Sequence, residues 1–175
     1  TWALPFDEAF HDFPGRHRNR SFWRRTHLLD NGDLLAIFEG LGIIKIDKDS
    51  RLMWASTERA HHDMAPLPDG RVWVLTREAP VIARLHKRRP VLADFLVLLD
   101  AQGQQVRSIS VVKALENSPF SDMWDRKIWR EGLLLHTNSV ELLDGSLADA
   151  NPAFVAGNLL ISMRMPHMVA VLDPG

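Results

Sequence analysis

The sequence predicts an all-β fold, and three observations support this prediction. Short apolar runs alternate with polar turns at intervals of about 8–12 residues, a spacing typical of antiparallel strands. The same order of a turn glycine, a strand and an apolar strand ending in aspartate occurs three times along the chain. Such units recur at roughly 40–50 residues, a period typical of propeller blades. We therefore expect β-propeller blades of four antiparallel strands.

The first unit is predicted over residues 22–56 and contains the strongest hairpin signal. Asn31-Gly32 lies between two apolar runs. This dipeptide favours a type I′ turn, in which both central residues have positive φ. The strands expected after this turn cover residues 34–38, 42–47 and 51–55.

The second and third units are predicted over residues 60–112 and 134–175. Their turn glycines are Gly70 and Gly157, and each unit repeats the strand pattern of the first. The apolar strands end in aspartate before a polar turn at three equivalent places: Asp47, Asp100 and Asp173. A propeller needs about 4–8 blades to close, so we expect these three blades to be part of a larger propeller.

Two inserted loops interrupt the regular spacing, at about residues 79–94 and 116–131. Within the second loop, residues 119–130 are predicted to be helical, because Ser121 or Asp122 can cap a helix there. Loops inserted between propeller blades tend to gather at one end of the barrel, where ligands bind.

Composition excludes several classes of function. The 175 residues carry a net charge of -1, which provides no general attraction to nucleic acid or anionic lipid. The short basic run at residues 86–89 is interpreted as a solvated loop. The absence of cysteine excludes disulfides and thiolate metal sites. No apolar run reaches the roughly 20 residues of a membrane-spanning helix, so no transmembrane segment is expected in this stretch.

Three polar clusters occupy the same place in the repeat, just before the turn-glycine strand: residues 24–27, 60–63 and 136–139. The first strand of each propeller blade lines the central channel, so equivalent positions in successive blades point toward a shared axis. Arg24, His62 and His136 are therefore expected to converge and to bind an anion. The alternative for a repeat histidine, above all His27, is a hydrogen bond within its own blade.

A metal site is not predicted. His61-His62-Asp63 offers imidazole and carboxylate ligands, which suit zinc or copper. Adjacent residues on a strand point to opposite faces, however, and no carboxylate recurs in register at the other clusters. The same lack of carboxylates disfavours a quinone- or metal-dependent oxidoreductase.

The motif His136-x-Asn138-Ser139, followed by Ser162-x-Arg164 and by an apolar strand ending in Asp173, resembles a known family. These features, together with the cluster at 60–63, make residues 22–175 similar to the bacterial arylsulfotransferases, which use aryl sulfate esters instead of a nucleotide donor. The resemblance implies a six-bladed propeller of the quinoprotein type, a periplasmic or otherwise exported protein, and no cofactor.

The resemblance also implies an activity and a site. The family passes a sulfuryl group from an aryl sulfate ester to a phenol through a covalent histidine. By motif, His62, His136, Asn138 and Arg164 correspond to the residues that hold the sulfate. The covalent histidine of the family lies in a later blade and has no match before Gly175. Residues 147–156 lengthen the link between the two motif halves. The alternative function is a non-catalytic propeller that serves as a binding or assembly scaffold.

Overall fold

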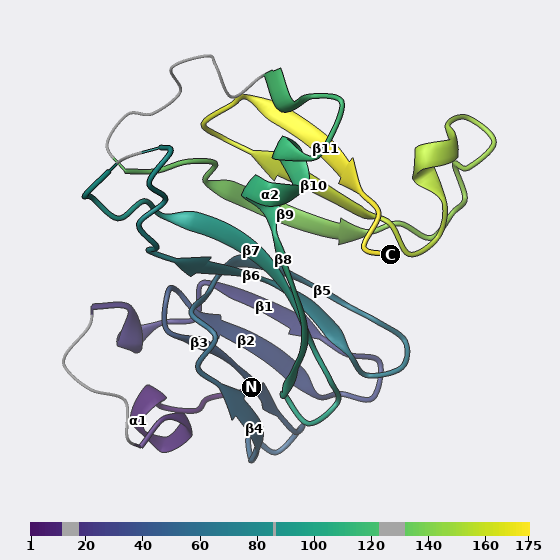
Figure 1. Ribbon diagram of the computed structural model, residues 1–175. Helices are drawn as coiled ribbons and strands as arrows, with labels where there is room; N and C mark the ends of the chain where they lie inside the picture. Colours follow the sequence, from purple (N-terminus) through teal and green to yellow (C-terminus); the bar gives the residue numbers. More distant parts are fainter. Residues whose placement is uncertain (12–17, 86, 123–131) are drawn as a thin grey trace.

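The architecture is all-β, as predicted. The computed structural model describes residues 1–11, 18–85, 87–122 and 132–175. Three antiparallel sheets follow one another along the chain, and among the described residues only two short α-helices occur, α1 (Phe6–Ala9) and α2 (Val111–Glu116). Figure 1 shows the sheets succeeding one another from the N-terminal to the C-terminal part, an arrangement consistent with a propeller-like fragment.

Each sheet is a meander in which neighbouring strands are consecutive in sequence. The first consists of β1 (Arg25–Leu28), β2 (Leu34–Phe38), β3 (Gly42–Ile46) and β4 (Leu52–Ser56). The second consists of β5 (Ala60–Pro66), β6 (Val72–Glu78), β7 (Ala93–Leu99) and β8 (Gln105–Ser110). The third has three described strands, β9 (Thr137–Leu142), β10 (Leu159–Met163) and β11 (Met168–Leu172). Two 3-10 helices, η1 (Arg18–Ser21) and η3 (Pro152–Phe154), lie in connections.

Apolar side chains pack the sheets face to face. Ile37 and Ile43 of the first sheet are fully buried against Val74 and Val97 of the second. A larger cluster joins the second sheet to the third and includes α2. β5 contacts β9 on one side and the first sheet on the other. The first strands of successive sheets therefore meet, which is the arrangement that the candidate site requires.

The hairpin turns differ from the predicted type I′ geometry. In the first turn, the Leu29 N–H donates to the Asp33 carbonyl and the Gly32 N–H donates to the Leu29 carbonyl, at 2.9 Å each. Gly32 has a φ of 87°, but Asn31 is not in the left-handed region. This is a three-residue loop with one left-handed residue. Asn31 contributes through its side chain instead, because its Oδ1 accepts from the Asp33 N–H at 3.1 Å.

The same turn recurs at residues 47–51, 67–71 and 100–104. Gly70, the turn glycine predicted for the second unit, has a positive φ of 88° in this turn. The recurrent aspartates close the outer turns: Asp47 Oδ1 accepts from two backbone N–H groups within its turn, and Asp100 Oδ1 does the same. These hydrogen bonds explain why an aspartate ends the apolar strand in successive units.

The predicted helix over residues 119–130 falls largely on residues 123–131, which lie outside the described part of the chain. The helix that the structure does describe nearby, α2, begins directly after β8, where the Ser110 side chain accepts from the Lys113 N–H. Along the described ranges, no helix combines the length and the hydrophobicity needed to cross a membrane.

Candidate functional site

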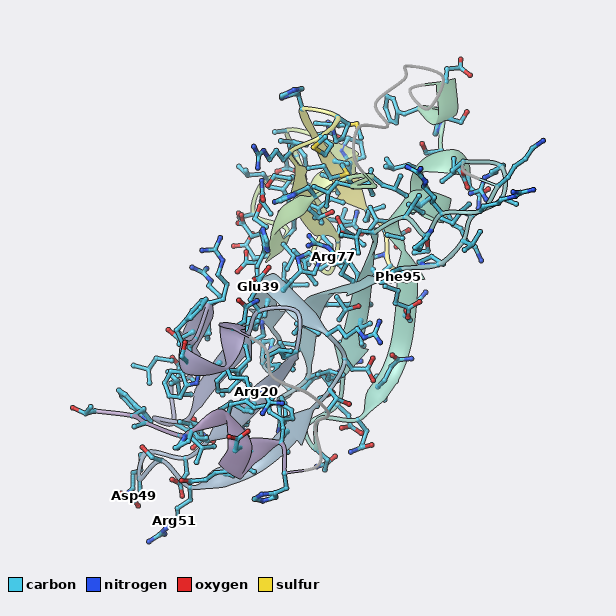
Figure 2. All side chains as sticks on the ribbon, turned by 90° about the vertical axis from the view of Figure 1, so that its left-hand side faces the viewer. Arg20, Glu39, Asp49, Arg51, Arg77 and Phe95 are labelled. Carbon is cyan, nitrogen blue, oxygen red and sulfur yellow. The ribbon has the colours of Figure 1, made fainter. Side chains whose placement is uncertain are left out.

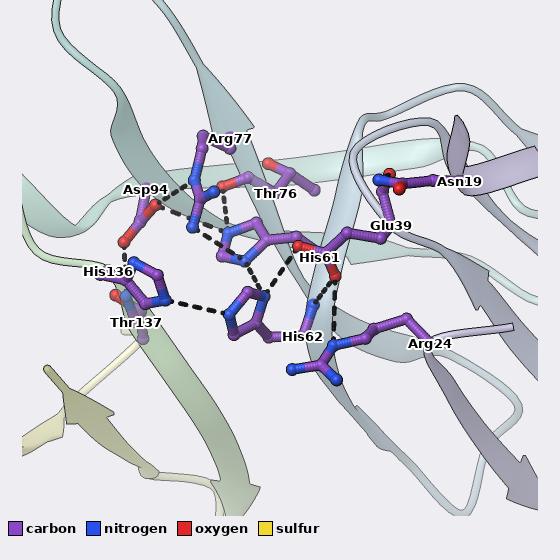
Figure 3. Close-up of polar contacts among 10 residues, drawn as sticks. All are labelled: Asn19, Arg24, Glu39, His61, His62, Thr76, Arg77, Asp94, His136 and Thr137. Atoms are coloured by element: carbon purple, nitrogen blue, oxygen red, sulfur yellow. Dashed lines mark hydrogen bonds and ion pairs between the residues drawn. The ribbon is translucent and has the colours of Figure 1, made fainter. Parts of the chain in front are cut away.

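A polar cluster lies where the three sheets meet. Figure 2 shows Glu39 and Arg77 near this junction, whereas Asp49 and Arg51 lie at the far end of the first sheet. Six side chains form the cluster, namely Glu39, His61, His62, Arg77, Asp94 and His136 (Figure 3). They come from the turn after β2, from β5, β6 and β7, and from the residue before β9.

His62 and His136 face each other across the junction between the second and third sheets. Their Nε2 atoms are 3.2 Å apart, and their rings meet edge to face. Both residues have left-handed backbones, with φ of 54° and 52°. A left-handed conformation is unfavourable for histidine and persists only where surrounding structure enforces it, so strained backbones of this kind cluster at functional sites. The repeat register placed these two histidines at equivalent positions, and the structure brings them into contact.

Glu39 fixes the orientation of His62. Glu39 Oε1 lies 3.0 Å from His62 Nδ1, and Oε2 accepts from the His62 backbone N–H at 3.2 Å. Burial opposes ionisation of this carboxyl, but the hydrogen bonds and the charge of His62 outweigh burial and lower the pKa of Glu39 to about 2. The ionised carboxylate only accepts, so His62 Nδ1 carries the proton and Nε2 faces His136.

His61 is fully buried beside His62, contrary to the expectation that adjacent histidines point to opposite faces. Their Nδ1 atoms lie 3.3 Å apart, because the left-handed backbone of His62 and the irregular register of β5 break the strand alternation. His61 Nε2 is 3.2 Å from the carbonyl of Thr76, so this nitrogen donates. Burial and then the charge of Arg77 lower the pKa of His61 to about 4, which keeps its ring neutral at pH 7.

Asp94 joins the second sheet to the third beneath the histidines. Its side chain is 1% exposed, and Oδ1 accepts from Arg77 Nε at 3.1 Å. Oδ2 accepts from the backbone N–H of Thr137 at 2.7 Å, which fixes the start of β9 and therefore the position of His136. The pKa of His136 is lowered by burial and by the charges of His62, Arg77 and Arg164. His136 is therefore neutral at pH 7, and its Nε2–H donates to His62.

Of the other predicted residues, Arg164 lies beside His136. Its backbone N–H donates to the His136 carbonyl at 3.1 Å, and its side chain is exposed. Asn138 is exposed on β9. Arg24 lies at the edge of the cluster, with Nε 3.7 Å from Glu39 Oε2. The structure thus brings His62 and His136 into direct contact, with Arg164 adjacent through the backbone.

Asp63 does not join the cluster. It pairs with Arg25 at 2.8 Å and accepts from the Val140 N–H at 3.2 Å, which links all three sheets. His27 is exposed on β1. Sequence reasoning missed Glu39, Arg77 and Asp94. The one available signal was Asp94, a carboxylate in an otherwise apolar run; Arg77 is its direct partner in the β6–β7 register.

A family model matches most of the chain. The family model described as Arylsulfotransferase (ASST) matches residues 25–175, which include all three sheets and every residue of the cluster. No curated protein matches the chain.

Proposed function

The chain belongs to the arylsulfotransferase family, and from this premise we propose that it transfers a sulfuryl group from an aryl sulfate ester to a phenolic acceptor without a nucleotide. His62, His136, Asn138 and Arg164 hold the sulfuryl group in this proposal. The remaining blades of a propeller complete the channel and supply the covalent histidine, and the protein works in the periplasm or another exported location.

The contact between His62 and His136 carries the proposal. Two imidazoles from neighbouring sheets present their Nε2 atoms to each other at 3.2 Å, and both are held there by strained backbones. An oxyanion that reaches this pair replaces His62 Nε2 as the acceptor of the His136 Nε2–H. Donors fixed in advance at the place where charge develops are the main source of catalysis in such sites.

Arg164 and Asn138 supply donors from the third sheet. The guanidinium presents a planar fork that matches two sulfate oxygens, and the amide adds an N–H donor. The exposed Arg164 side chain is available to an anion, and its charge already acts on His136. Sulfuryl transfer resembles phosphoryl transfer in spreading charge over equatorial oxygens, which favours several fixed donors over a single acid or base.

Glu39 selects the tautomer of His62 that can accept a proton at Nε2. With Nδ1–H donated to the carboxylate, the lone pair of Nε2 faces the site and can accept the proton of the phenol. His136 keeps its Nε2–H as a donor. The two histidines therefore divide the roles of base and anion donor.

The test is release of 4-nitrophenolate from 4-nitrophenyl sulfate by the full-length protein, which includes the remaining blades of this proposal, with phenol as acceptor and no nucleotide present. His62→Asn removes the ring but keeps a residue that tolerates left-handed backbone. We expect this variant to lose at least about 100-fold in kcat/KM, in line with general acid–base contributions. His27→Asn, on the exposed β1, is the matched control and should keep the activity. Equal turnover in His62→Asn and the native protein would overturn the proposal.

A further inference from the structure

We propose that Glu39, His61 and His62 bind a divalent transition-metal ion of the zinc type. One carboxylate oxygen and two imidazole nitrogens lie within 4.8 Å of one another, and all three side chains are at least half-buried. Metal binding is separate from sulfuryl transfer and can be measured without a substrate.

The distances between the donor atoms suit a tetrahedral ion. Zinc binds imidazole nitrogen at about 2.0–2.1 Å, so two tetrahedral nitrogen ligands lie about 3.3 Å apart. His61 Nδ1 and His62 Nδ1 are 3.3 Å apart, and Glu39 Oε1 is 3.0 Å from His62 Nδ1. Two nitrogens and one carboxylate oxygen are the donor set that zinc and related ions prefer.

The hydrogen-bond partners of these ligand side chains resemble the partners that hold histidine ligands around bound metal ions. A ligating histidine usually donates its other N–H to a carboxylate or a carbonyl, which fixes the ring and its tautomer. His61 Nε2 donates to the Thr76 carbonyl at 3.2 Å and lies 3.5 Å from Asp94 Oδ1. His61 Nδ1 therefore carries the lone pair that an ion needs. Glu39 is held by the His62 backbone N–H through Oε2, which leaves Oε1 toward the ion.

The Arg77 guanidinium occupies the position beside His61 Nδ1 that a metal ion would take. Its Nη2 lies 3.4 Å from His61 Nδ1, so an ion displaces this contact while Arg77 Nε keeps Asp94 at 3.1 Å. The ion also replaces the proton on His62 Nδ1, which moves that proton to Nε2. A bound ion therefore converts His62 from an acceptor into a donor toward His136. The His136 ring proton then moves from Nε2 to Nδ1, a buried atom without a partner among the described residues, so that His136 Nε2 can accept.

Three protein ligands leave one tetrahedral position open, as in zinc sites that bind a small molecule. The sequence did not predict a metal, because adjacent histidines on a regular strand point to opposite faces and no carboxylate recurs in register at the other polar clusters. The structure provides Glu39 instead, from the turn between β2 and β3, and Asp63 is engaged with Arg25.

The experiment is titration of the tag-free, chelator-treated protein with Co²⁺, followed by visible absorption, and then displacement with Zn²⁺. We expect one equivalent to bind with the absorption bands of a tetrahedral nitrogen–oxygen site. Glu39→Gln removes the charged ligand with little change in shape and should weaken binding at least about tenfold, and so should His62→Asn. Glu141→Gln is the matched control, because Glu141 is exposed on β9.

The Co²⁺ titration can either support or overturn the metal site. One equivalent bound by the native protein and by Glu141→Gln, with loss in both ligand variants, supports the site. Absence of stoichiometric binding to the native protein overturns it, as does equal affinity in Glu39→Gln. Because no aryl sulfate is present, failure of this test leaves the sulfuryl-transfer proposal standing, and loss of transferase activity leaves the metal result standing.

Discussion

At the scale of single residues, the site depends on how each histidine is oriented. His62 is held through its ring by Glu39 and through its left-handed backbone, whereas His136 is held by the bond from Thr137 to Asp94. The sequence was sufficient to pair His62 with His136, because both follow the same register in the repeat. It was not sufficient to find Glu39, because the turn after β2 has no equivalent carboxylate in the other units.

Arg164→Lys tests the guanidinium fork. Lysine keeps the positive charge but presents a single ammonium, so two sulfate oxygens lose their paired donors. We expect transfer from 4-nitrophenyl sulfate to fall by roughly tenfold or more in kcat/KM, with an unchanged unfolding midpoint because the side chain is exposed. Turnover equal to that of the native protein would remove Arg164 from the site.

At the scale of strands and turns, the same three-residue loop recurs in four hairpins, closed by residues 29 and 33, 47 and 51, 67 and 71, and 100 and 104. The glycine and aspartate positions were predictable because each serves a local need, positive φ in one case and a side-chain acceptor in the other. The turn type was predicted wrongly. Asn31 stabilises the turn through hydrogen bonds from its side chain to Asp33. The Asn-Gly rule assumes instead that asparagine adopts a left-handed backbone, so it predicted the wrong turn type.

Gly70→Val tests the turn before β6. A β-branched residue is strained at a φ of 88°, so we expect the free energy of unfolding to fall by about 1–3 kcal/mol in urea titrations. Gly70→Asn is the control, since asparagine tolerates the left-handed region and should cost less. A valine variant as stable as the asparagine variant would contradict the assigned turn geometry.

At the scale of the whole molecule, a few buried polar contacts fix how the sheets meet. Apolar packing between sheets is predictable from strand patterns, but the partners of a buried carboxylate are not. Asp94 connects Arg77 to the start of β9, and Asp63 connects Arg25 to Val140. The contacts of Asp94 with Thr137 and of Asp63 with Arg25 and Val140 join different sheets, so local sequence patterns do not specify them.

Asp94→Ala tests this connection. Removing the carboxylate leaves the Arg77 guanidinium and the Thr137 N–H without their buried acceptor. We expect a loss on the order of 3 kcal/mol in the free energy of unfolding, measured by urea titration. Asp30→Ala, at an exposed position in the first turn, should have little effect. Equal stability of the two variants would show that Asp94 does not hold the sheets together.

Acid should destabilise the metal-free protein in two stages. The pKa of His61 is lowered from 6.5 to about 4, so unfolded chains take up a proton that folded ones exclude, and stability falls as pH drops through that window. The pKa of Glu39 is lowered from 4.5 to about 2, which extends the loss to lower pH. Unfolding midpoints measured with a chelator should fall steadily below pH 6.5. A midpoint that stays constant from pH 7 to pH 4 would contradict the burial of a neutral His61.

The most direct test of the central claim is a crystal structure of the protein with an aryl sulfate bound. We predict that sulfate oxygens lie within about 2.7–3.2 Å of His136 Nε2 and of the Arg164 guanidinium, with His62 Nε2 facing the same group. That result would place the sulfuryl group at the contact between the two histidines. A sulfate bound elsewhere, with His62 and His136 still in mutual contact, would contradict the account.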